Sequence, residues 1–193
     1  IGSKNTFFGN RARINLALFY TTVNDAQVPT LVLPDAVTVT QNAGELTSKG
    51  VELELGLNPL KGLEVDYNFG YTDAKYTRLN LPSNGTAVDF ADNRQIFTPD
   101  ITSALALQYG YLVNKINNLK LIARGEWRYT GKQYFDLENQ LQQSPYNLLN
   151  GRIGFSSSTV DFFIWGSNLS DEKYVDYAYN FGAAHLGNPR TYG

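Results

Sequence analysis

Residues 50–71 alternate between apolar and polar side chains on both sides of one tight turn. A period of two is typical of β-strands, because successive side chains point to opposite faces, so this stretch predicts a β-hairpin. One face is apolar and ends in aromatic residues, and the other carries carboxylates. This pattern is expected where one face meets lipid and the other meets a wet lumen. The apolar face comprises Val51, Leu53, Leu55, Leu57, Leu63, Val65, Tyr67, Phe69 and Tyr71, and the acidic residues are Glu52, Glu54, Glu64 and Asp66.

Strand patterns recur along the chain, and their connections alternate between short and long. Outer-membrane barrels have short turns at the periplasmic end and longer loops at the extracellular end, whereas a soluble all-β domain has no reason to place its long loops together. The predicted fold class is therefore all-β, an antiparallel transmembrane β-barrel segment. Strands are predicted over 11–23, 27–33, 50–57, 63–71, 101–109, 119–129, 146–155 and 159–168, with another starting at 190. Short turns are predicted at 24–26, 58–62 and 156–158, and a modest one at 110–118. Longer loops are predicted at 34–45, where residues 36–41 can stay extended, and at 76–100, 131–145 and 169–189.

The composition agrees with this fold and excludes several functions. The 193 residues include 13 Tyr and 11 Phe, which favour strands and membrane interfaces. No apolar run approaches the ~20 residues that a spanning helix needs. The absence of cysteine excludes disulfides, thiolate metal sites and cysteine nucleophiles. A net charge of −2 without a basic stripe gives no support for nucleic-acid binding. The chain begins at Ile1 without a signal peptide and contains no Met, so we expect a fragment of a longer precursor.

Three segments carry a resemblance to a known family. They are NLALFYTTVNDAQ (15–27) with NAGELTSKGVELEL (42–55), then WGSNLSDEKY (165–174), then GNPRTYG (187–193). In this order and spacing they resemble the C-terminal part of the barrel of TonB-dependent outer-membrane receptors. The matching motif residues are Asn168, Leu169, Asp171, Tyr174, Gly187, Pro189 and Arg190.

The resemblance implies a bacterial outer-membrane location and a place in a barrel of about 22 strands around a plugged lumen. Residues 1–193 would form the C-terminal part of that barrel, and the plug domain and TonB box have no counterpart in them. The implied function is TonB-dependent uptake of a scarce nutrient, with an iron–siderophore chelate as the leading expectation. The implied partners are outer-membrane lipid, the TonB complex and a small-molecule ligand, without nucleic acid.

Two loop clusters are the candidate ligand contacts, because loops carry function more often than the scaffold does. A solvated extracellular loop explains them almost as well. The candidates are Asp89, Asp92, Arg94 and Gln95 in the first cluster, and Tyr134 and Asp136 in the second.

Other polar and aromatic residues have simpler explanations. The carboxylates of 52–66 are expected on a polar lumen wall, hydrated or paired with Lys120, Arg124 and Arg128, rather than in a catalytic site. Asn168 and Asp171 fit turn chemistry, and the lone His185 is expected to be solvated. We expect no catalytic residue, metal site or cofactor. An interface girdle is predicted from Tyr20, Tyr71, Tyr109, Trp127 and Tyr129.

Two other readings stay open at this point. One is a small barrel of about eight to ten strands with an adhesion or structural role. It requires residues 11–23 to pair with the last strand of the same chain. The other is a hydrolase, for which the missing cysteines and single histidine leave little catalytic material.

Overall fold

The computed structural model describes residues 1–32, 37–83, 86–179 and 181–193. In this part of the chain no helix is long and apolar enough to cross a membrane. The strands are β1 (Gly2–Phe7), β2 (Ala12–Val32), β3 (Val37–Leu60), β4 (Leu63–Ser83), β5 (Thr86–Asp89), β6 (Ile101–Asn114), β7 (Leu119–Thr130), β8 (Gln133–Tyr134), β9 (Gln142–Gln143), β10 (Tyr146–Ser156), β11 (Asp161–Ser167), β12 (Val175–Ala178), β13 (Ala184–Leu186) and β14 (Thr191–Tyr192).

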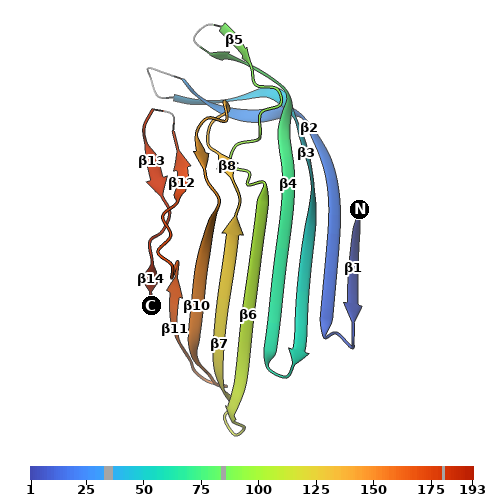
Figure 1. The fold of residues 1–193 in the computed structure, drawn as a ribbon, viewed down its shortest axis with the longest axis vertical. Coiled ribbons are helices and arrows are strands. Elements are labelled where there is room, and N and C mark those ends of the chain that lie inside the picture. The colour runs from blue at the N-terminus through green and yellow to red at the C-terminus, as the bar shows by residue number, and fades with distance from the viewer. Residues whose placement is uncertain (33–36, 84–85, 180) are drawn as a thin grey trace.

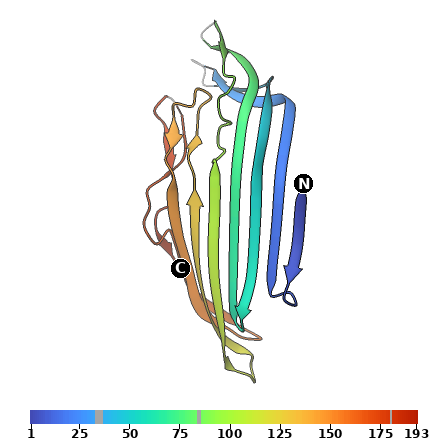
Figure 2. The same cartoon turned by 45° about the vertical axis from the view of Figure 1, so that its right-hand side comes forward.

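Ten of these strands form one curved antiparallel sheet, which resembles a sector cut from a barrel wall (Figure 1). The order is β1-β2-β3-β4-β6-β7-β10-β11-β14, with β5 paired to β4 alone. Sequence neighbours are therefore spatial neighbours throughout. The edge strands β1 and β14 lie at opposite sides of the sheet (Figures 1 and 2). Strand 12–32 pairs with β1 and β3, so in the described residues the pairing that a small closed barrel requires is not made.

The register sorts the side chains into two faces, as the alternation predicts. Leu53 pairs with Leu16 and Phe69, and the row continues across the sheet through Ser103 and Tyr129. These side chains share the outer, apolar face. The residues between them share the inner face, which is polar. This confirms the predicted separation of lipid-facing and lumen-facing positions in the hairpin and in β7.

The short connections gather at one end of the sheet, the bottom in Figure 1. They join β1 to β2, β3 to β4, β6 to β7, and β10 to β11. Arg11 ties two of these turns together, because its side chain donates to the carbonyl oxygens of Asn58 (3.2 Å) and Pro59 (2.8 Å). The turn at residues 8–11 was not predicted, since the sequence pattern gave no strand before residue 11.

The predicted turn at residues 24–26 is wrong. β2 runs without interruption from Ala12 to Val32, and residues 24–26 form a bulge in its pairing with β3. Asp25 has a positive φ of 54° there, a conformation that Asn and Asp adopt more easily than most residues. The turn-forming residues therefore bend the strand instead of ending it. Beyond the bulge, the β2–β3 hairpin leans across the top of the sheet (Figures 1 and 2).

The four predicted longer loops are also partly wrong, because each contains strand residues. The loop 131–145 contains β8 and β9, and the loop 169–189 contains β12 and β13. Longer strands continue into the other two loops. β3 begins at Val37, which agrees with the expectation that residues 36–41 can stay extended, but the strand also includes residues 42–45 of the predicted loop. Residues 33–36 lie outside the described part. β4 continues to Ser83 and pairs with β5, inside the predicted loop 76–100. Residues 76–83 lack the regular apolar and polar alternation of the hairpin below them, so the pattern did not reveal the extension of β4.

We call the part of the sheet beyond the bulge the crown: β2 from residue 26, β3 up to residue 46, β4 from residue 76, and β5. The remaining paired strands are the ladder. The crown holds the main buried cluster of the described chain, in which Leu79 and Val28 are fully buried. Leu137, from the loop between β7 and β10, packs against it. The cluster comprises Ala26, Val28, Leu46, Tyr76, Leu79, Leu81 and Phe90.

Candidate functional site

The inner face of the ladder is polar and its charges are segregated by strand. Glu52, Glu54, Glu64 and Asp66 lie on β3 and β4, where Asn15 donates to Glu54 (2.8 Å) and Gln108 donates to Glu64 (3.0 Å). Among the described residues Glu54 and Glu64 thus accept from side-chain amides and not from Lys120, Arg124 or Arg128. Hydration of these carboxylates, the other expectation, stays a prediction. The separation follows from the register, since the uncharged inner face of β6 lies between β4 and β7.

The basic side of the inner face lies on β7 and β10. Arg124 (3.6 Å) and Arg128 both pair with Glu126 on their own strand. Arg152 of β10 lies opposite Arg124, with its guanidinium 5.2 Å from the ring centroid of Phe163. Together with Lys120, these residues give β7 and β10 a net positive wall. A carboxylate-lined wall and a guanidinium-lined wall thus face the lumen from opposite sides of β6.

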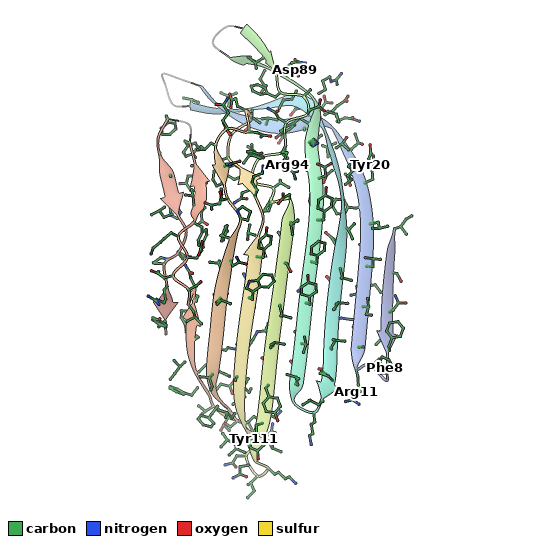
Figure 3. All side chains as sticks on the ribbon, in the orientation of Figure 1. Phe8, Arg11, Tyr20, Asp89, Arg94 and Tyr111 are labelled. Atoms are coloured by element: carbon green, nitrogen blue, oxygen red, sulfur yellow. The ribbon has the colours of Figure 1, made fainter. Side chains whose placement is uncertain are left out.

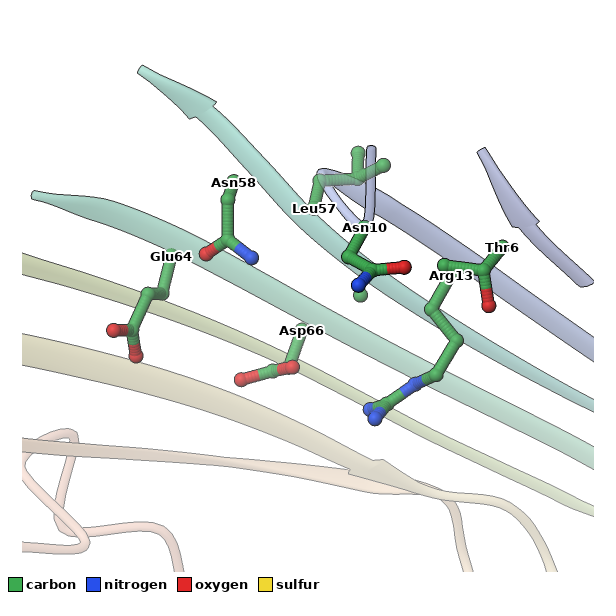
Figure 4. Close-up of a pocket in the computed structure, with 8 residues that line it drawn as sticks. Thr6, Asn10, Arg13, Leu57, Asn58, Glu64 and Asp66 are labelled. Atoms are coloured by element: carbon green, nitrogen blue, oxygen red, sulfur yellow. The ribbon is translucent and has the colours of Figure 1, made fainter. Parts of the chain in front are cut away.

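A hollow of about 440 Å³ opens on the inner face near the short turns. Figure 4 shows the Arg13 and Asp66 side chains extending into it from neighbouring parts of the wall. Arg13 lies across Gly56, where an added Cβ would come within 3.3 Å of its guanidinium. The lining is Thr6, Asn10, Arg13, Gly56, Leu57, Asn58, Glu64 and Asp66.

The first candidate loop cluster lies at the opposite end of the sheet, where Figure 3 labels Asp89 and Arg94. Asp89 accepts a hydrogen bond from the backbone of Ala91 (2.9 Å) and is exposed. Asp92 is exposed with a positive φ of 66°, and the Gln95 backbone donates to Ala74 (2.9 Å). Arg94 lies opposite Lys75 and donates to the backbone of Thr72 (3.0 Å). The structure therefore brings these four residues to one end of the sheet, where each makes its own local contacts.

The second candidate cluster lies beside the first. Tyr134 accepts a backbone hydrogen bond from Phe97 (2.8 Å), and the Lys132 ammonium lies 5.0 Å from the Tyr134 ring centroid. Asp136 accepts a hydrogen bond from the backbone of Leu141 (2.8 Å) and so shapes its own loop.

One residue that the sequence did not single out holds the two loops together. Asn139 accepts from the Arg94 backbone (2.6 Å) and donates to the Arg94 carbonyl (3.1 Å). Asn93 donates in the other direction, to the carbonyl of Leu137 (2.7 Å), and the Phe97 and Phe135 rings lie 5.7 Å apart. We call this set the latch: Asn93, Arg94, Phe97, Phe135, Leu137 and Asn139. Asparagine in a polar loop is a usable signal, since it bonds local backbone and tolerates positive φ, but its partner 45 residues away is set by the fold.

The motif residues around Asn168 build a compact structural joint. Asn168 is 4% exposed, accepts from the Glu172 backbone (2.8 Å), and donates to the carbonyls of Glu172 (2.9 Å) and Asn188 (3.0 Å). Tyr174 stacks on Tyr146 with ring centroids 4.4 Å apart. These contacts agree with the interpretation of the motif as turn chemistry.

The second half of the motif closes onto the first. A Cβ at Gly187 would lie 2.1 Å from the Tyr174 ring, so only glycine fits there. Arg190 donates to the Leu169 carbonyl (3.4 Å), and its backbone donates to Asp171 (3.3 Å). The hydrogen bond from Lys173 and then that from the Arg190 backbone lower the pKa of Asp171. Pro189 precedes β14 in this joint.

His185 lies on the β12–β13 hairpin among exposed aromatic side chains. Its ring stacks on Tyr177 at 5.5 Å, and its Nδ1 lies 3.5 Å from an Asp176 oxygen. Tyr179 and Phe181 continue this row of rings, with centroids 5.1 Å apart. Within the described residues no group of three His, Cys, Asp or Glu side chains could hold a metal ion.

Comparisons with known proteins agree with this geometry. The family model described as "TonB dependent receptor-like, beta-barrel" matches residues 1–169. The pesticin receptor of Yersinia pestis is 27% identical over 184 residues, which cover 93% of this chain and 26% of the receptor. The ferrichrome outer membrane transporter/phage receptor of Escherichia coli is 26% identical over 164 residues, which cover 81% of this chain and 20% of that protein.

Solved structures show the same fold. The ferric yersiniabactin uptake receptor of Yersinia pestis matches with a TM-score of 0.79 and 24% identity, over 99% of this chain and 28% of that one. The siderophore receptor PiuA of Acinetobacter baumannii matches with a TM-score of 0.76 and 23% identity, over 98% of this chain and 26% of that one. The chain thus spans about a quarter of the length of these relatives, which are named as receptors and transporters and not as enzymes. The chain belongs to the β-barrel family of TonB-dependent receptors, which lie in the bacterial outer membrane.

Proposed function

We propose that the receptor to which this chain belongs imports an iron–siderophore chelate across the outer membrane, with energy delivered through TonB. The relatives named above support this proposal, since several are named for siderophores or for ferrichrome. The plug domain and the TonB box would lie outside residues 1–193. No covalent step is assigned to this chain.

The observation that carries the proposal is that the two faces and the two ends of the sheet differ in chemistry. The outer face is apolar and meets lipid, the inner face is charged and faces the lumen, and the latched loops lie together at the extracellular end. A transport receptor needs these three surfaces in one wall. In this arrangement the segments 90–99 and 134–141 form one rim, and Asp89, Asp92, Arg94, Gln95, Tyr134 and Asp136 are its proposed ligand contacts.

Uptake by the complete receptor tests the proposal. Cells that carry the full-length receptor as their only siderophore receptor would be given radioactive iron bound to ferrichrome, yersiniabactin, preacinetobactin or pyoverdine. We expect accumulation of at least one chelate, and we expect it to disappear when TonB is deleted. Accumulation without TonB would refute the energy coupling, and uptake of none of these chelates, with normal surface expression, would argue against this substrate class.

A further inference from the structure

A cluster of charged side chains lies on the outer, lipid-facing surface. Asp73 is contacted by the Lys49 ammonium (3.6 Å), the Lys75 ammonium (3.9 Å) and the Arg94 guanidinium (3.8 Å). Register places the cluster on this face, because Lys49 pairs with both Tyr20 and Asp73, two residues beyond Tyr71 on β4. Arg94 joins the same face, since it lies opposite Lys75 in an isolated bridge.

The position of the cluster corresponds to the headgroup level of the outer leaflet. The apolar stretch of β4 from Leu63 to Tyr71, which pairs with Tyr109 to Ile101, is nine residues long, within the ~9–11 residues that a tilted transmembrane β-strand needs to cross the hydrocarbon core. An apolar band about 25 Å tall with aromatic girdles at both borders is the normal dimension of an outer-membrane barrel. Tyr109 and Tyr71 mark the two borders here, so Lys49, Asp73 and Lys75 lie directly beyond the extracellular border.

The charges of the cluster do not balance. Three cations surround one carboxylate, which leaves an excess of two positive charges. Asp73 is nearly covered, with 16% of its side chain exposed, whereas Lys49 and Lys75 remain 59% and 45% exposed. The exposed ammonium groups therefore retain donors that Asp73 does not use. The elements around the cluster, β2, β3, β4 and the segment that carries Arg94, all belong to this chain, so neighbouring barrel strands do not cover it.

We propose that Lys49 and Lys75, the two most exposed cations of the cluster, bind the phosphate groups of a phosphorylated glycolipid in the outer leaflet. Lysine and arginine donate charge-assisted hydrogen bonds to phosphate, and such a pair is screened less at a lipid surface than in bulk water. Tyr20 and Tyr71 contact the glycolipid at the level where its headgroup meets its acyl chains. Asp73 holds the cations apart and limits the net charge of the site. This inference requires the outer-membrane location but not the proposed transport substrate.

Lipid binding by the full-length receptor tests the site. The receptor would be purified in detergent, stripped of lipid, and titrated with bisphosphorylated lipid A while bound lipid is counted by native mass spectrometry. For the double variant Lys49→Gln/Lys75→Gln we expect at least a fivefold weaker affinity. The matched control Lys61→Gln/Lys115→Gln changes two lysines in the periplasmic turns, and we expect it to bind like the wild type. A dephosphorylated lipid A should bind no receptor form at this site.

The variant Asp73→Asn separates lipid binding from a purely structural network. It breaks all three ion pairs but raises the excess positive charge from two to three, so we expect lipid A to bind at least twofold more tightly. A network that only fixes the strands predicts no gain. Unchanged affinity in Lys49→Gln/Lys75→Gln, a loss in Asp73→Asn, or complete displacement of lipid A by millimolar inorganic phosphate would overturn the proposal.

Discussion

The ladder and the crown share strands β2, β3 and β4 but are stabilised in different ways. In the ladder, backbone pairing is continuous and the side chains divide into an apolar outer face and a charged inner face. In the crown, the same strands bend away and a buried apolar cluster, joined by side-chain hydrogen bonds between loops, holds them. The comparison teaches that the lipid environment sets the side-chain pattern of the ladder, whereas the crown is stabilised in water by its own buried cluster. Substitutions in the two regions should therefore destabilise the receptor in different ways.

The largest effect is expected from a charge on the outer face of the ladder. Leu53→Arg places a guanidinium in the middle of the apolar row that includes Leu16 and Phe69. A cation at this depth costs up to about 4 kcal/mol in an outer-membrane barrel. We expect the free energy of unfolding of the full-length receptor in lipid vesicles, measured with guanidinium, to fall by that order. The matched variant Asn68→Arg on the inner face of β4 should cost much less, and equal losses would contradict the assignment of the faces.

Removal of a buried side chain from the crown should be nearly as costly but local. Leu79 is 0% exposed, and truncation of such a leucine to alanine costs about 3 kcal/mol. Leu79→Ala should therefore speed hydrogen exchange in the crown segments 26–32, 37–46 and 76–83 while β6 and β7 keep their protection. Exchange that rises equally in the ladder would show that the two regions unfold as one unit.

The sequence predicted the ladder well and the crown poorly. Alternation of period two is visible wherever one face meets lipid, and the registers of Leu53 with Leu16 and of Trp127 with Leu105 confirm it. The crown lacks this signal because water surrounds it, so β5 and the extensions of β3 and β4 were predicted as loops. Residues 27–33 were predicted as a separate strand after a turn and not as a continuation of β2. Asp25 shows the limit of prediction from sequence patterns most clearly, since turn-forming residues bend a strand as readily as they end it.

The candidate site was predictable only in part. The loops that carry Asp89, Arg94 and Tyr134 lie at the end of the sheet opposite the short turns, as the order of short and long connections predicts. Asn139 was missed because its importance comes from Arg94, which lies 45 residues away in sequence. Long-range hydrogen bonds between loops follow from the fold and leave no periodic pattern.

A smaller effect is expected from the latch. Asn139→Ala removes the hydrogen bonds to the Arg94 backbone, each with a net contribution of about 1 kcal/mol. The loops should separate without loss of the barrel, and the affinity for the transported chelate should fall about threefold to tenfold while surface expression stays constant. Asn117→Ala in the periplasmic turn is the control. Unchanged affinity in Asn139→Ala would show that the latch does not contribute to ligand binding.

The smallest effect is expected from pH at the joint near β14. The pKa of Asp171 is lowered, first by the hydrogen bond from Lys173. A lowered pKa in the folded state means that the carboxylate adds stability above the unfolded pKa of about 3.9. This contribution is lost as the pH falls through the folded pKa. The protection factor of the Arg190 amide, its intrinsic exchange rate divided by the observed rate, should therefore fall in acid, and Asp171→Asn should abolish this acid-dependent fall. An identical pH profile in both proteins would show that Asp171 does not hold Arg190.

The central claim is that the latched rim captures ligand while the ladder acts as a fixed wall. Hydrogen–deuterium exchange on the full-length receptor in lipid, with and without the ferric chelate that it imports, tests this claim most directly. We predict that the chelate slows exchange in segments 90–99 and 134–141 and leaves the ladder strands β3, β4, β6 and β7 unchanged. Protection confined to other parts of the receptor, with no change in these two segments, would contradict the account.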